Sequence, residues 1–169
     1  VPLTNGNYVV ASPFWNSSLA DVGAVTFCNG SIGCVGSVST ANSLTGSSTG
    51  DGVGGATVGA SQSPIALTNG NYVVRSRLWD GVAPDTGAVT WCSGTTGCTG
   101  NVSSANSLFG STQNDQVGDF TFLAMQNGNY VVSSTLWDGP ATDVGAVTWC
   151  NGATGRVGPV SAANSIVGS

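Results

Sequence analysis

Cysteine is the residue type in this chain whose spacing most directly suggests chemistry. Cys28 and Cys34 flank a glycine-rich segment, and Cys92 and Cys98 repeat the same spacing later in the 169-residue chain. A glycine-rich loop between two strands can bring its flanking residues opposite each other, which is the geometry that a disulfide needs. We therefore expect two disulfides, Cys28–Cys34 and Cys92–Cys98, with buried free thiols as the alternative. Disulfides would favour an extracellular or cell-surface location.

The fifth cysteine, Cys150, has no partner at this spacing. Arg156 stands where the other two segments carry their second cysteine. Cys150 is then either a core residue or a thiol that forms an intermolecular bond with a neighbouring chain. Zinc is not expected, because the cysteine pairs lack flanking histidines. The sequence thus predicts no metal site and no cofactor.

Missing residue types exclude most other chemistry. The chain has three basic residues, all of them Arg, and eight acidic residues, all of them Asp. It has no Lys, Glu or His, and its net charge is −5. Without His there is no Ser-His-Asp triad, and without Lys there is no Schiff base and no P-loop. Three cations are too few to neutralise a nucleic-acid backbone. No segment approaches the ~20 apolar residues of a membrane span. We predict a protein that is not an enzyme, binds no nucleic acid and has no membrane span.

Three copies of one motif organise the chain. Asn-Gly-Asn-Tyr-Val-Val begins at Asn5, Asn69 and Asn127, and each copy precedes a Trp, a Gly-Ala-Val-Thr segment and an Ala-Asn-Ser segment. Such repetition indicates stacked structural units. We expect one repeat domain, residues 1–169, with repeat 1 at about 1–52, repeat 2 at about 53–115 and repeat 3 at about 116–169.

The third repeat predicts four strands, at 117–125, 130–137, 145–150 and a weaker one at about 157–167 that contains Pro159. Asn127-Gly128 is typical of a type I′ hairpin turn, in which both central residues have positive φ. The predicted fold is all-β, with three tandem four-stranded antiparallel meanders. One meander is marginally stable alone, so aromatic and valine side chains are expected to pack between repeats: Trp79, Trp137, Trp91, Trp149, Val89 and Val147.

A resemblance follows from the same residues. Val117-Gly118, the Asn127 motif, Gly145-Ala-Val-Thr-Trp and Ser165-Ile-Val-Gly168 together resemble the integrin-type FG-GAP propeller blade. The repeat sequence as a whole is also similar to a tandem repeat of unknown function in secreted, haemagglutinin-like bacterial surface proteins. These resemblances imply propeller-like blades. The calcium site of FG-GAP blades is not carried over, because Asn-Gly-Asn is too short and too weakly acidic for it.

The number of repeats raises a question of closure. Propellers need 4 to 8 blades to close, so three blades would form an open arc with an unpaired edge at each end. Such edges invite pairing with another chain. Ring closure by oligomerisation, head-to-tail growth into a filament, and excision from a longer protein are the alternatives. A β-trefoil is the rival fold, since three repeats of four strands also fit it.

Two functions fit these features. The first is a non-enzymatic extracellular structural or adhesive protein that self-associates through its open edges into a homo-oligomer, fibre or surface matrix. The second is a multivalent carbohydrate-binding, lectin-like module. Its candidate glycan contacts are Trp79, Asp80, Trp137 and Asp138. The loop aspartates are otherwise expected to form turns.

Overall fold

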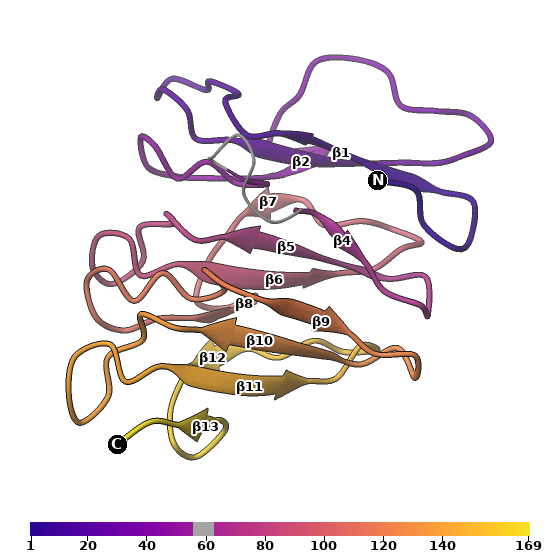
Figure 1. Ribbon diagram of the computed structural model, residues 1–169. Helices are drawn as coiled ribbons and strands as arrows, with labels where there is room; N and C mark the ends of the chain where they lie inside the picture. Colours follow the sequence, from indigo (N-terminus) through magenta and orange to yellow (C-terminus); the bar gives the residue numbers. More distant parts are fainter. Residues whose placement is uncertain (56–62) are drawn as a thin grey trace.

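The computed structural model describes residues 1–55 and 63–169, and residues 56–62 of the predicted second repeat lie outside the described residues. The described chain is all-β and contains no helix. Its strands form three separate sheets, which lie one above another in sequence order (Figure 1). The prediction of three tandem β units is confirmed. No closed barrel forms among the described strands, so the stacked, blade-like arrangement replaces the β-trefoil alternative.

The first sheet is built from β1 (Tyr8–Ser12), β2 (Ala24–Cys28), β3 (Ser43–Thr45) and the short β7 (Gly100–Asn101). The second contains β4 (Ile65–Ala66), β5 (Tyr72–Ser76), β6 (Ala88–Cys92), β8 (Ser107–Phe109) and the short β12 (Gly158–Pro159). The third contains β9 (Phe122–Ala124), β10 (Tyr130–Ser134), β11 (Ala146–Cys150) and β13 (Ile166–Val167).

Each sheet is an antiparallel meander, and the first two gain one strand from the next repeat. β7 pairs in parallel with β3, with Leu44 opposite Gly100. β12 pairs in parallel with β8, with Leu108 opposite Gly158. Successive sheets are therefore joined by backbone hydrogen bonds as well as by packing. β13 is the equivalent edge of the third sheet, and no described strand pairs with it on that side.

The predicted fourth strand at 157–167 is wrong as a continuous element. Its two ends belong to different sheets: Gly158–Pro159 extends the second sheet and Ile166–Val167 completes the third. Proline lacks the N–H that an interior strand position must donate, so it is restricted to edges such as this one. The predicted strand at 117–125 is also shorter than expected, because the Val117 N–H bonds to the Thr86 carbonyl instead.

The predicted type I′ turn at Asn127-Gly128 is also wrong. The Gly128 N–H donates to the Met125 carbonyl at 3.0 Å, so Gln126 and Asn127 are the central residues of the turn. Only Gly128 has a positive φ, of 86°. This is a longer hairpin loop that ends in a glycine bulge. The Oδ1 atom of Asn127 accepts the N–H of Asn129 within this loop, at 3.1 Å.

The core lies between the sheets. Each sheet has an N-face, toward the preceding repeat, and a C-face, toward the following one. One cluster of buried side chains joins the C-face of sheet 1 to the N-face of sheet 2, and a second cluster joins sheets 2 and 3. In the second cluster the C-face residues Val73, Val89 and Leu108 pack against Tyr130 and other side chains of the third sheet.

The C-face of the third sheet carries the same pattern without a cover. Val89 and Leu108 are fully buried, whereas their counterparts Val147 and Ile166 are 42% and 79% exposed. Trp149, the counterpart of Trp91, is 47% exposed. The expected packing between repeats is confirmed for four side chains, Trp79, Trp137, Trp91 and Val89. Trp149 and Val147 instead lie on an outer face.

This contrast predicts different stabilities for two equivalent substitutions. Leu108→Ala should lower the free energy of unfolding by about 2 to 5 kcal/mol, because it opens a cavity between sheets 2 and 3. Ile166→Ala at the matching position should change it by about 0.5 kcal/mol or less, because its side chain is already in water. Chemical denaturation of both variants measures the difference, and equal losses would contradict the stacked arrangement.

Candidate functional site

The Asn-Gly-Asn motifs join one repeat to the next through their side-chain amides. The Nδ2 groups of Asn69 and Asn71 both donate to the carbonyl oxygen of Gly152, at 2.8 and 3.0 Å. Each donor comes from a repeat different from that of the acceptor. The junction between repeats 1 and 2 has the same arrangement, at 2.7 and 2.9 Å, made by Asn5, Asn7 and Gly94.

The second asparagine of each motif also holds its own repeat. The Oδ1 atom of Asn71 accepts the N–H of Gly94 at 3.0 Å, and Asn129 accepts that of Gly152 at the same distance. We call Gly30, Gly94 and Gly152 the glycine corners. A Cβ at Gly94 or Gly152 would lie 1.6 Å from a backbone oxygen of the preceding hairpin turn. Only glycine fits, and its carbonyl is left pointing to the neighbouring repeat.

An aromatic side chain completes the contact. Trp91 donates its indole Nε1–H to the same Gly152 carbonyl at 2.8 Å, so that oxygen receives three hydrogen bonds from repeat 2. The Trp91 side chain also covers Gly155, where an added Cβ would lie 2.5 Å from the Trp91 Cβ. Phe27 covers Gly97 at the first junction in the same way. The aromatic side chain therefore fixes the distance between adjacent sheets.

Two buried aspartates make a second link. Asp51 accepts the backbone N–H groups of Ser47 and Ser48 on Oδ2 and that of Asp80, in the next repeat, on Oδ1. Burial raises the pKa of Asp51 above the ordinary aspartate value, while these backbone donors lower it. Asp115 repeats the pattern one junction later, with Ser111, Thr112 and Asp138 as donors.

The loop aspartates are turn residues, as predicted. Asp80 accepts the N–H of Asp85 at 2.9 Å, and Asp138 accepts that of Asp143 at 2.8 Å. Asp85 and Asp143 both adopt positive φ. Short polar side chains tolerate this conformation better than others. These side chains are therefore used to shape the loops.

The residues of the predicted glycan contacts lie mostly within the structure. Trp79 and Trp137 are only 5% and 6% exposed, and the Trp79 ring meets Phe109 edge to face at 6.3 Å. A sugar-stacking ring must present a face to solvent, and neither ring does. Asp80 and Asp138 are occupied by the turn and junction contacts described above. These positions do not favour the carbohydrate-binding alternative, which stays a prediction.

The cysteine pairs lie where disulfides can form. The sulfurs of Cys28 and Cys34 are 1.99 Å apart, and those of Cys92 and Cys98 are 2.17 Å apart. Two pairs at bonding distance are consistent with an extracellular location. Cys150 is buried, with no exposed surface, and it belongs to the cluster between sheets 2 and 3. An intermolecular bond from this sulfur would require that junction to open.

The two ends of the stack carry half of a junction each. At the N-terminal end the glycine corner Gly30 is exposed, whereas Gly94 and Gly152 are buried. At the other end, within the described residues, the Nδ2 groups of Asn127 and Asn129 and the Nε1 group of Trp149 have no acceptor. The acceptor and the donors of one junction are thus both present, at opposite ends of the molecule.

The described residues contain no arranged group of metal ligands and no apolar helix of membrane-spanning length. Among them, no group of three or more Cys, Asp, Glu or His side chains is arranged to hold a metal ion. No helix in the same part of the chain is long and apolar enough to cross a membrane. The candidate functional site is therefore the junction surface itself, as it appears uncovered at the two ends.

Sequence reasoning missed the role of the asparagines and of Asp51 and Asp115. It assigned the Asn-Gly-Asn motif to turn formation alone. A signal was available, because both asparagines recur in all three copies, although a hairpin turn of this kind needs only its glycine. The aspartates also recur, in the Gly50-Asp51 and Asn114-Asp115 segments, at equivalent positions of two consecutive repeats. Formation of a turn alone would not require the same residue type at both positions.

The amide contacts predict a position-dependent effect of one substitution. Asn71→Asp keeps the oxygen that accepts from Gly94 but places a carboxylate against the Gly152 carbonyl, so the free energy of unfolding should fall by about 1 to 3 kcal/mol. Asn129→Asp, the matched control, keeps its acceptor and has no carbonyl to repel, so stability should hardly change. Thermal and chemical unfolding of both variants test this. A harmless Asn71→Asp would mean that the junction does not rest on these bonds.

Burial also predicts the reactivity of the free thiol. Desolvation raises the pKa of Cys150 to about 11, so at pH 8 the group is a neutral thiol, and only the thiolate is a good nucleophile. Iodoacetamide at pH 8 should leave the native chain unmodified and add one label to the unfolded, unreduced chain, as read by mass spectrometry. Rapid labelling of the native chain would show that the junction between sheets 2 and 3 is open.

Comparison with known proteins agrees with the threefold organisation. The model of the family described as "Repeat of unknown function (DUF5650)" matches residues 2–55, 66–119 and 124–169. No curated protein and no solved structure matches the chain. The resemblances to FG-GAP blades and to haemagglutinin-like surface proteins stay predictions. Since the three matches cover nearly the whole sequence, the chain belongs to the DUF5650 repeat family.

Proposed function

We propose that this chain is a non-enzymatic, extracellular structural and adhesive repeat protein that self-associates through the open faces and edges of its terminal sheets. Association of this kind would extend the stack into a fibre or surface matrix. The observation that carries the proposal is the pair of uncovered half-junctions. Residues that are buried between sheets 1 and 2 and between sheets 2 and 3 recur in exposed form at the ends.

The apolar part of this surface supports association. Leu123, Val147, Trp149 and Ile166 lie on the outer side of the third sheet and are all more than 40% exposed. Scattered exposed apolar residues are normal, but a contiguous patch on one sheet face marks an interaction surface. Two short strands, β9 and β13, also leave unpaired edges on this sheet.

Several polar side chains are buried and already hydrogen-bonded within the protein, which supports a structural role over a catalytic one. Catalysis needs carboxylates or nucleophiles that can reach a substrate. Asp51 and Asp115 are instead buried and accept backbone N–H groups, and Cys150 is enclosed in the core. The cysteine pairs at bonding distance support the extracellular assignment, because disulfides persist in oxidising environments.

Sedimentation velocity over a wide concentration range tests the proposal. We expect the weight-average mass to rise with protein concentration under oxidising conditions, and elongated particles to appear by negative-stain electron microscopy. Alkylation of free thiols without reductant should not remove the association, because the free cysteine, Cys150, is buried between sheets 2 and 3. A single monomeric species at every concentration would contradict the proposed function.

A further inference from the structure

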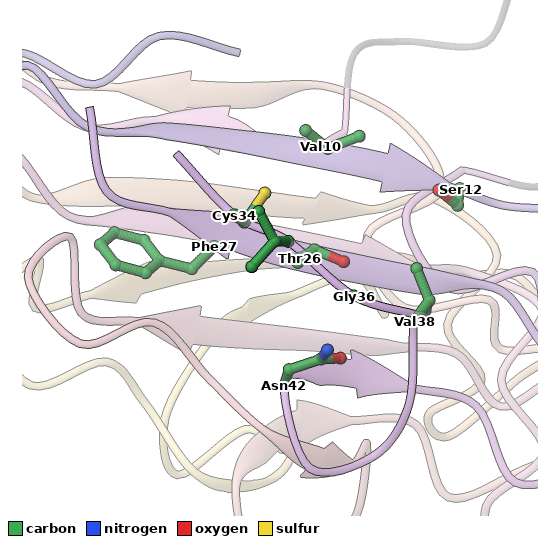
Figure 2. A pocket seen from close by; sticks show the side chains of 9 residues that line it. Val10, Ser12, Thr26, Phe27, Cys34, Gly36, Val38 and Asn42 are labelled. Carbon is green, nitrogen blue, oxygen red and sulfur yellow. The ribbon is translucent and has the colours of Figure 1, made fainter. Parts of the chain in front are cut away.

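An apolar hollow lies on the N-face of the first sheet. It has a volume of about 170 Å³, and Val10, Thr26, Cys34 and Val38 are among the residues that line it. Figure 2 shows these side chains around the hollow, with Phe27 at one end and Ser12 at the other. Val10 is 42% exposed. The described chain thus leaves this part of the face open, although Ala24 and Ser43 on the same face are buried.

The internal junctions show what covers the equivalent surfaces. The counterparts of Val10 and Val38 in repeat 2 are Val74 and Val102, and both are buried in the cluster that joins sheets 1 and 2. Their cover is the C-face of the preceding repeat, which contributes side chains to the same cluster: Val9, Val25, Leu44 and Phe27. A hollow of this type is therefore the receiving side of a junction between repeats.

The matching C-face is present at the other end of the chain. The counterparts of Val25, Phe27 and Leu44 in the third repeat are Val147, Trp149 and Ile166. All three project from the C-face of the third sheet without a cover. The molecule thus carries an apolar projection at one end and an apolar hollow at the other. Both are equivalent to surfaces that pack against each other at its internal junctions.

The polar groups fix the register between these two surfaces. At the internal junction the Gly152 carbonyl accepts hydrogen bonds from Asn69, Asn71 and Trp91. The free equivalents are the Gly30 carbonyl on the N-face, and the donors on the C-face: Asn127, Asn129 and Trp149. The backbone offers a second match. Inside the molecule β8 pairs in parallel with β12. The counterpart of β8 in the third repeat is the edge strand β13, and the counterpart of β12 in the first repeat is the segment Gly36-Ser37.

We infer that the C-face of the third sheet docks onto the N-face of the first sheet of a second copy of this chain. This inference rests on the proposed function and names its partner and its contacts. Val147, Trp149 and Ile166 enter the hollow around Val10 and Val38. The donors of Asn127, Asn129 and Trp149 bind the Gly30 carbonyl of the second copy. Because the two surfaces differ, the contact is heterologous and repeats without a built-in end.

The intermolecular junction differs from the internal ones in how its two halves are connected. The two copies are not held together by a covalent chain, which would raise their effective concentration. The docking is therefore reversible and depends on protein concentration.

A pair of charge variants tests the docking. Val10→Arg blocks the N-face and Val147→Arg blocks the C-face, and both valines are half-exposed, so each variant should fold; circular dichroism melting checks this. Each variant alone should be monomeric in sedimentation velocity, because every contact needs one intact surface of each kind. An equimolar mixture should form a one-to-one dimer that does not grow further.

Several results would overturn the inference. If the wild type associates but either variant alone still forms dimers, the contact is isologous and the assignment of faces is wrong. If the wild type associates and the mixture stays monomeric, the two faces do not bind each other. If the hollow instead receives a second protein or an apolar ligand, Val10→Arg will self-associate as strongly as the wild type. A monomeric wild type would instead remove the proposed function itself.

Substitution of the asparagines separates the polar contact from the apolar one. The double variant Asn127→Asp with Asn129→Asp keeps the acceptor oxygens used inside the repeat and loses the two donors to the Gly30 carbonyl. Self-association should weaken by about tenfold or more, while the melting temperature of the monomer stays unchanged. Unchanged association would show that the glycine corner is not the register element.

Discussion

Contact between the faces of successive sheets is the interaction on which this structure depends. Each sheet consists of strands of two to five residues, which bury little apolar surface within one layer. Stacking converts the side chains on both faces of the middle sheet into core, so β5 has no exposed residue. The fold is therefore a one-dimensional array in which each repeat contacts its neighbours. Its stability comes from the junctions, and Val10 on the first sheet and Val147 on the third lack the cover that their counterparts Val74 and Val89 have.

Polar side chains give this stacking its register. Apolar faces alone would allow a sheet to slide, because hydrophobic burial has no direction. One carbonyl that accepts hydrogen bonds from several donors of the neighbouring repeat removes this freedom, since a shifted sheet would leave those groups unpaired and buried. The buried aspartates add a second fixed point. The motif asparagines together with Asp51 and Asp115 therefore set how successive repeats align.

Much of the fold followed from the sequence, and the failures have a physical cause. The three motif copies gave the number of repeats, and β-branched and aromatic residues gave the main strands, such as Tyr130–Ser134. The chain path near Pro159 was not predictable from local pattern, because strand exchange between sheets depends on the position of the neighbouring repeat. The burial of Trp79 and Trp137 was predicted as packing between repeats and is confirmed, although a Trp-Asp-Gly segment suits both a core and a sugar site. The second role of the asparagines lay in tertiary contacts that no local rule describes.

The central claim is that stacked junctions make the three repeats one cooperative unit. Denaturant unfolding followed by tryptophan fluorescence and by far-ultraviolet circular dichroism tests it most directly, because the indole signal reports the junctions and the dichroism reports the strands. The account predicts one transition with coincident midpoints for the two probes. Separate transitions, with strand structure that persists after the tryptophan signal is lost, would show that the repeats are stable without their contacts and would contradict the account.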